Sequence, residues 1–154
     1  MEIAELITPQ AVVPSLRAAG KRQLLQELAK RAAALAGLDE KTVLEALVER
    51  ERLGSTGIGG GTAVPHARLS GIARMFALFA RLDRPIPFES VDDQPVDLVF
   101  LLLAPESAGA DHLKALARIS RLLRDQAVCA KLRGTDSADA LYALLTDRTA
   151  SHAA

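Results

Sequence analysis

The sequence predicts a single α/β domain, with a small mixed β-sheet flanked by helices on both faces. Stretches with apolar residues at helical spacing alternate with short, almost continuously apolar runs. Two such runs, 74–82 and 96–103, are apolar on both faces, which is typical of strands that helices cover from both sides. The 154 residues, 49% of them hydrophobic, can form one core without disulfides. We expect the domain at 1–148 and a flexible tail at 149–154.

Two helices are expected in the first third of the chain. Leucines and alanines recur at helical spacing over 21–35, and Gly37 follows where a glycine commonly ends a helix. The next helix starts at Asp39, whose carboxylate can accept hydrogen bonds from the free amides of the first turn. We expect Gly54 to end that helix.

The remaining elements are shorter or less regular. Residues 63–64 form a short strand candidate that ends at Pro65, because proline has no amide hydrogen for a strand ladder. A third helix is expected near Asp111, with an apolar stripe facing the core. Two short helices close the chain, and Asp125 and Asp136 are their predicted N-caps.

Composition excludes several classes of protein. The 19 basic residues balance 19 acidic residues, and aromatic residues make up only 3%, so neither a nucleic acid nor an anionic membrane is an expected partner. The single cysteine excludes an internal disulfide, and no HExxH or CxxC motif points to a metal. No apolar run approaches the ~20 residues of a membrane span, and no signal peptide opens the chain. We expect a cytoplasmic protein.

His66 is the first candidate for chemistry. Imidazole is mostly neutral at cellular pH, so one ring nitrogen keeps a lone pair that can act as a nucleophile or a base. Pro65 places this ring at a predicted strand end beside a glycine-rich loop, and strand ends of α/β sheets often carry functional sites. The alternative is a surface histidine at a turn.

Four further residues are candidates to support an anion. His112 falls in the first turn of a predicted helix, where free amides favour anions, and Arg50 can bind phosphate through two parallel hydrogen bonds. Ser55 and Thr56 can add hydroxyl donors. The alternatives are an exposed first-turn histidine, a solvated charged helix face, and ordinary turn residues.

The glycine-rich stretch 54–62 could direct backbone amides at an anion. It is not a Walker A loop, since Thr62 and Ala63 follow the last glycine where that motif needs Lys and then Ser or Thr. It is not a Rossmann loop either, because it runs from a helix to a strand. The alternative is a flexible surface loop.

The run RERLGSTGIGGGTAVPHA, residues 50–67, resembles the active-site region of fructose- and mannitol-type IIA proteins of the bacterial phosphoenolpyruvate-dependent phosphotransferase system. It is most similar to their nitrogen-regulatory branch, in which an RE-x-LGSTGIG run precedes Pro-His. The resemblance covers almost the whole chain, including PVDLVF from Pro95 and DHL from Asp111. Thr62 departs from it, since an aliphatic residue usually stands there.

The resemblance implies a phosphoryl carrier without a cofactor or metal. His66 would accept a phosphoryl group from a histidine-containing phosphocarrier protein, with Arg50, His112 and loop amides, supported by Ser55 and Thr56, stabilising the transferred charge. The phosphorylation state would then control the binding of regulated targets, such as potassium-transport components or sensor kinases.

Two alternatives stay open at this point. The chain could be a sugar-specific IIA component that passes phosphate to a IIB domain for fructose or mannitol uptake, since the same histidine would serve either route. It could also be a binding module whose histidine is never modified. The residues of the LGSTGIG run favour the nitrogen-regulatory branch.

Overall fold

The computed structural model describes residues 1–147 and contains one mixed six-stranded sheet between two layers of helices. Within the described residues the strands are β1 (Val12–Leu16), β2 (Gly57–Gly59), β3 (Thr62–Ala63), β4 (His66–Leu69), β5 (Phe76–Ile86) and β6 (Val96–Pro105). The helices of three residues are η1 (Ile3–Glu5), η2 (Pro9–Ala11) and η3 (Glu106–Ala108). The longer helices are α1 (Lys21–Ala36), α2 (Glu40–Arg52), α3 (Ala110–Arg124), α4 (Gln126–Arg133) and α5 (Ala138–Leu145).

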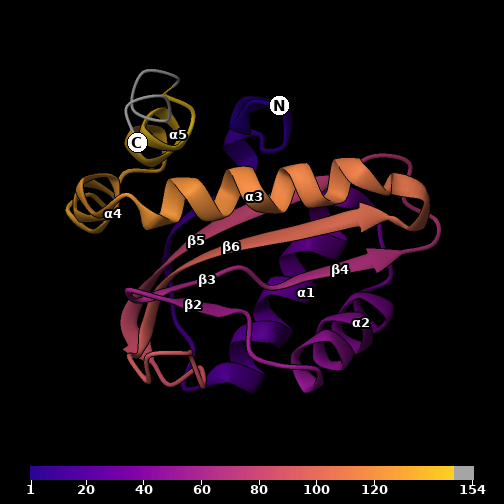
Figure 1. Cartoon of the computed structure of the whole chain (residues 1–154), viewed down its shortest axis with the longest axis horizontal. Helices are drawn as coiled ribbons and strands as arrows, with labels where there is room; N and C mark the ends of the chain where they lie inside the picture. Colours follow the sequence, from indigo (N-terminus) through magenta and orange to yellow (C-terminus); the bar gives the residue numbers. More distant parts are fainter. Residues whose placement is uncertain (148–154) are drawn as a thin grey trace.

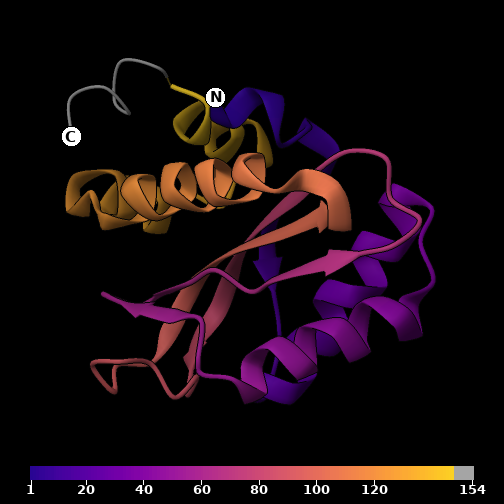
Figure 2. The ribbon, with the colours of Figure 1, turned by 45° about the vertical axis from the view of Figure 1, so that its right-hand side comes forward.

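The predicted architecture is confirmed. Helix α3 crosses one face of the sheet, and α1 and α2 cover the other, as Figures 1 and 2 show from two directions. Helix α5 lies beside the N-terminal segment. The predicted tail at 149–154 lies outside the described residues. No helix within 1–147 combines the length and apolar character that crossing a membrane requires.

Strand β6 is the centre of the sheet. It pairs antiparallel with β5, which in turn pairs in parallel with β1. On its other side it pairs in parallel with both β3 and β4. Its residues from Leu98 to Ala104 are fully buried, which explains the continuous apolar run in the sequence.

The strand expected to end at Pro65 does end before it, and a new strand begins directly after this proline. Strands β3 and β4 lie end to end along β6, separated by Val64 and Pro65, and Figure 1 shows them on one line. The missing amide of Pro65 interrupts the ladder, while its carbonyl still accepts from the amide of Leu102 at 3.0 Å. His66 is therefore the first residue of a new strand, at the edge of the sheet.

The helix caps agree with the predictions except in one case. Asp39 caps α2 through the amide of Thr42, at 2.9 Å, and Asp125 caps α4. The prediction for Asp136 is wrong, because α5 starts one residue later and Ser137 caps it by accepting from the amide of Ala140.

Candidate functional site

His66 is held in one neutral tautomer. Its Nδ1 lies 2.8 Å from the carbonyl oxygen of Val64. Since a carbonyl oxygen can only accept, Nδ1 carries the proton in this contact and Nε2 keeps its lone pair. The residue is half-buried and lies on β4 at the edge of the sheet, outside the fully buried core.

Arg50 faces that lone pair. The residue lies in the last turn of α2 and donates from Nε to Nε2 of His66 at 3.2 Å. A second donor, Nη1, binds the carbonyl of Gly54 at 2.9 Å, which fixes the guanidinium across the end of the helix. The structure thus brings together two candidate residues that are sixteen positions apart in the sequence.

His112 is the third member of the group. It lies in the first turn of α3, the helix that covers the face of the sheet opposite to α2. Its ring centroid is 5.7 Å from that of His66, and the two ring planes are inclined by 66°. The residue is only 5% exposed, so it is not the exposed first-turn histidine considered as the alternative. Its Nδ1 accepts from Nε of Arg68 at 2.9 Å, and its Nε2 is buried without a hydrogen-bond partner among the described residues.

The environment favours the neutral form of both imidazoles. Burial lowers the pKa of His66 below its ordinary value of 6.5, and the charge of Arg50 lowers it further, although the hydrogen bond to Val64 acts in the opposite direction. Burial also lowers the pKa of His112, and His66 and Arg68 add to that effect. A neutral imidazole is the form with a nucleophilic lone pair.

Ser55 and Thr56 follow Gly54 in the loop after α2, and their hydroxyls donate to Phe88 and Glu51 rather than to a residue of this group. The hydroxyl of Ser55 donates to the carbonyl of Phe88 at 2.7 Å, and that of Thr56 donates to the carboxylate of Glu51 in a short hydrogen bond. Glu51 also accepts from the amide of Thr56 at 3.1 Å and pairs with Lys21 at 3.0 Å. These contacts shape the loop that follows Arg50.

The glycine-rich stretch forms a hairpin rather than a cradle beside His66. Its turn joins β2 and β3, at the opposite end of the sheet edge from β4 (Figure 1). The amide of Gly60 donates to Asp92 at 3.0 Å, and its carbonyl accepts from Arg133. Gly57 is needed for space, because a Cβ there would collide with the side chain of Ser90.

Sequence reasoning missed Arg68 and Glu51. Arg68 stands two positions after His66, and alternation along a strand places both side chains on the same face of β4. That spacing was visible in the sequence, but the strand was expected to end before His66. No sequence pattern indicated that the Glu51 side chain is buried, because a carboxylate among other charged residues at a helix end is usually solvated.

Two exposed leucines flank the histidines. Leu53 directly follows α2, near Arg50, and is 85% exposed, while Leu113 follows His112 and is 63% exposed. Single exposed apolar side chains are common on protein surfaces, and these two directly follow α2 and His112 along the chain. In the described part of the chain, no three metal-ligating side chains cluster.

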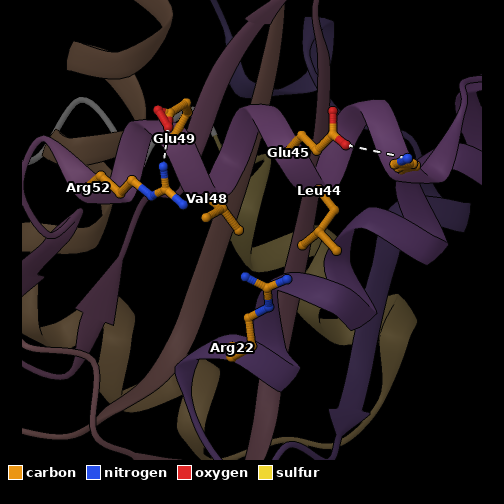
Figure 3. Close-up of a pocket in the computed structure, with 7 residues that line it drawn as sticks. Arg22, Leu44, Glu45, Val48, Glu49 and Arg52 are labelled. Carbon is orange, nitrogen blue, oxygen red and sulfur yellow. Dashed lines mark hydrogen bonds and ion pairs between the residues drawn. The ribbon is translucent and has the colours of Figure 1, made fainter.

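A separate hollow lies between α1 and α2, away from the histidines (Figure 3). Its charged rim includes the ion pairs of Arg52 with Glu49 and of Lys41 with Glu45. None of the five predicted site residues lines it.

Comparison with known proteins identifies the family. Residues 5–148 match the model of the family "Phosphoenolpyruvate-dependent sugar phosphotransferase system, EIIA 2". A relative named "Nitrogen regulatory protein", from Bradyrhizobium diazoefficiens, is 59% identical over 94% of this chain and 95% of its own length. The "PTS system fructose-specific EIIABC component" of Bacillus subtilis is 33% identical over 94% of this chain and 23% of its own length.

A solved structure agrees with both the sequence relatives and the fold. The "Nitrogen Regulatory Protein IIA-Ntr" of Neisseria meningitidis superposes with a TM-score of 0.89 at 33% identity, covering 94% of this chain and 99% of its own. The family resemblance read from the residues around Arg50 and His66 is therefore confirmed. The chain belongs to the EIIA 2 family of the phosphoenolpyruvate-dependent sugar phosphotransferase system.

Proposed function

We propose that this protein is a phosphoryl carrier whose His66 accepts a phosphoryl group on Nε2 from a phosphohistidine of a carrier protein. The observation that carries the proposal is the geometry of one ring. Nδ1–H of His66 is committed to the carbonyl of Val64, and the free lone pair on Nε2 faces the guanidinium of Arg50. Membership of a phosphotransferase-system family supports the same role.

The transfer needs no external proton. The Nε2 lone pair attacks phosphorus in line as the phosphorus–nitrogen bond of the donor breaks. A donor ring protonated on its other nitrogen leaves as neutral imidazole, and the electron pair of the broken bond stays on it. His66 becomes a phosphoimidazolium, and its Nδ1–H donates to the carbonyl of Val64, which stabilises the new positive charge.

Arg50 and His112 stabilise the charge on the transferring group. For the lone pair of His66 to be used, the Nε–H of Arg50 moves from the ring nitrogen to a phosphoryl oxygen. His112 offers a second donor from the other side. Ser55 and Thr56 act indirectly in this proposal, because their hydroxyls hold the loop after α2 through Phe88 and Glu51.

The partner is a protein, and the exposed apolar side chains of Leu53 and Leu113 suit its docking around the histidines. Phosphorylation adds about two negative charges at the centre of this surface, which is enough to change which partner binds. The nitrogen-regulatory relatives support a regulatory output. In this proposal the regulated targets are proteins such as potassium-transport components or sensor kinases.

A sugar-specific IIA role is the second candidate. The fructose-specific relative is 33% identical, close to the 34% of the nitrogen regulatory protein of Escherichia coli. The proposed acceptor would serve either route. The much higher identity to the Bradyrhizobium relative favours regulation.

The test is phosphorylation by the upstream proteins. The chain is incubated with phosphoenolpyruvate, enzyme I and a histidine phosphocarrier, and its intact mass is measured under basic conditions that preserve phosphohistidine. We expect a gain of one phosphoryl group that is lost in His66→Gln and retained in His112→Gln. No gain, or labelling at another residue, would contradict the proposal. Efficient transfer onward to a fructose or mannitol IIB domain would favour the second candidate.

A further inference from the structure

Arg68 connects the second imidazole of the site to the strand that carries the first. Its Nε–H donates to Nδ1 of His112 at 2.9 Å. The Arg68 backbone lies on β4, in register with Ala104 of β6, so the strand fixes the starting point of the side chain. The residue is exposed, and its guanidinium forms no ion pair with a carboxylate of residues 1–147. Its hydrogen bond to His112 is thus its main contact with the site.

This contact determines where His112 carries its proton. An arginine nitrogen can only donate, so Nδ1 of His112 must accept and cannot hold a hydrogen. In the neutral ring the hydrogen is then on Nε2. That Nε2–H is buried and has no acceptor among the described residues. A buried donor without a partner costs free energy, and a role in binding or reaction is one of the reasons for which native proteins keep such a group.

We propose that Arg68 is a positioning residue, which holds His112 as the Nε2–H tautomer so that this hydrogen donates to a phosphoryl oxygen on His66. The inference rests on the proposed function of His66. The two rings are in edge-to-face contact, with centroids 5.7 Å apart and planes inclined by 66°, so an oxygen of a phosphoryl group on His66 would lie within reach of His112. Without Arg68, the hydrogen of His112 would be free to move to Nδ1, and a lone pair on Nε2 would face the anionic oxygens.

The same contact explains why an arginine suits position 68. A cation next to Nδ1 opposes protonation of His112, so the ring stays neutral and keeps a single defined donor. The guanidinium also brings positive charge near the phosphoryl position without touching His66. The alternative is that Arg68 is only a solvated arginine on an edge strand. In that case, replacing Arg68 would leave the tautomer of His112 unchanged.

Two substitutions of similar size separate the hydrogen bond from the side chain's bulk. Arg68→Gln keeps an N–H donor, whereas Arg68→Met has none. The tautomer of His112 is read from long-range nitrogen–hydrogen correlation spectra of the unphosphorylated protein. The rate of phosphoryl transfer to the chain is measured separately. We expect the Nε2–H tautomer in the unsubstituted protein and in Arg68→Gln, and a shift towards Nδ1–H in Arg68→Met.

Transfer should slow roughly tenfold or more in Arg68→Met, in the range that loss of a partner orienting a functional imidazole gives, with labelling still at His66. Arg68→Gln should recover much of the rate. In a His112→Ala background, Arg68→Met should have little further effect on the rate, because Arg68 acts through His112.

A hydrogen on Nδ1 of His112 in the unsubstituted protein, or an unchanged tautomer in Arg68→Met, would overturn the proposal. So would a shifted tautomer with an unchanged rate. Because the tautomer is measured without phosphate, a chain that is never labelled at His66 would instead identify the failure as one of the proposed function.

Discussion

Arg50 and His66 come from different elements and meet through one hydrogen bond, from Nε to Nε2, at 3.2 Å. Helix α2 ends where its last turn reaches the start of β4, so the contact depends on the end of the helix and on the break in the ladder at Pro65. The bond places a fixed cation at the only free nitrogen of the half-buried ring.

Replacing Arg50 should slow phosphoryl transfer without moving the label. Arg50→Ala removes a donor that stabilises charge in the transition state, and losses of this kind are roughly 100- to 1000-fold in rate. Arg52→Ala is the matched control, because Arg52 lies on the same turn but pairs with exposed Glu49. Single-turnover transfer from a phosphorylated carrier measures both. Equal rates for the two variants would remove Arg50 from the site.

The free energy of unfolding should fall on acidification because of the two site histidines. Their pKa values are below 6.5 in the folded protein, so below about pH 6.5 the unfolded chain binds more protons than the folded one. Stability from this source is complete above that pH and is lost as the pH falls through the lower folded pKa values. Urea unfolding at about pH 7.5 and 5.5 measures the change. A variant carrying His66→Gln and His112→Gln should lose less stability over this interval, and an identical loss would contradict the assignment.

Glu51 should stabilise the fold far more than its neighbour Glu49. The side chain of Glu51 is 6% exposed and binds Lys21 and Thr56, whereas that of Glu49 is 64% exposed and pairs with the exposed Arg52. Glu51→Ala leaves buried donors without an acceptor, so we expect a loss of about 2 kcal/mol. Glu49→Ala should change stability by less than about 0.5 kcal/mol. Chemical denaturation measures both, and similar values would mean that the Glu51 contacts do not stabilise the fold.

Gly57 should not tolerate a methyl group. A Cβ there would overlap the side chain of Ser90, which is itself buried, so Gly57→Ala should cost about 1–3 kcal/mol through overpacking. Gly134→Ala is the control, because its Cβ would make an ordinary contact with the carbonyl of Ala130. Equal midpoints of thermal unfolding for the two variants would contradict the overlap.

The sequence predicted those parts of the fold that depend on local signals. Helices α1 and α2 could be read from apolar spacing and from the cap at Asp39, because these contacts lie within a few residues of each other. Strand β1 was missed, since it is short and contains Pro14, which only an edge strand accommodates easily. Strand β5 extends past Pro85 to Ile86, beyond the end of the apolar run 74–82 from which it was predicted.

The candidate site was predicted only in part for the same reason. The residue types and their positions already indicated His66, His112 and Arg50 as candidates, and the family resemblance gave each of them a role in phosphoryl transfer. Neither the burial of His112 nor its hydrogen bond to Arg68, forty-four positions away, leaves a pattern in the sequence. Such contacts depend on how α3 is placed over β6, which is decided by packing of the whole core.

The corrected cap of α5 gives a last prediction. Ser137 accepts from the amide of Ala140, while Asp136 precedes the helix and caps nothing in the described chain. Ser137→Ala should therefore cost about 1 kcal/mol, the usual value for loss of an N-cap, and Asp136→Ala should leave stability nearly unchanged. Both residues are exposed, so neither substitution disturbs the core. Urea denaturation of the two variants decides between the caps, since a larger loss for Asp136→Ala would restore the assignment made from the sequence.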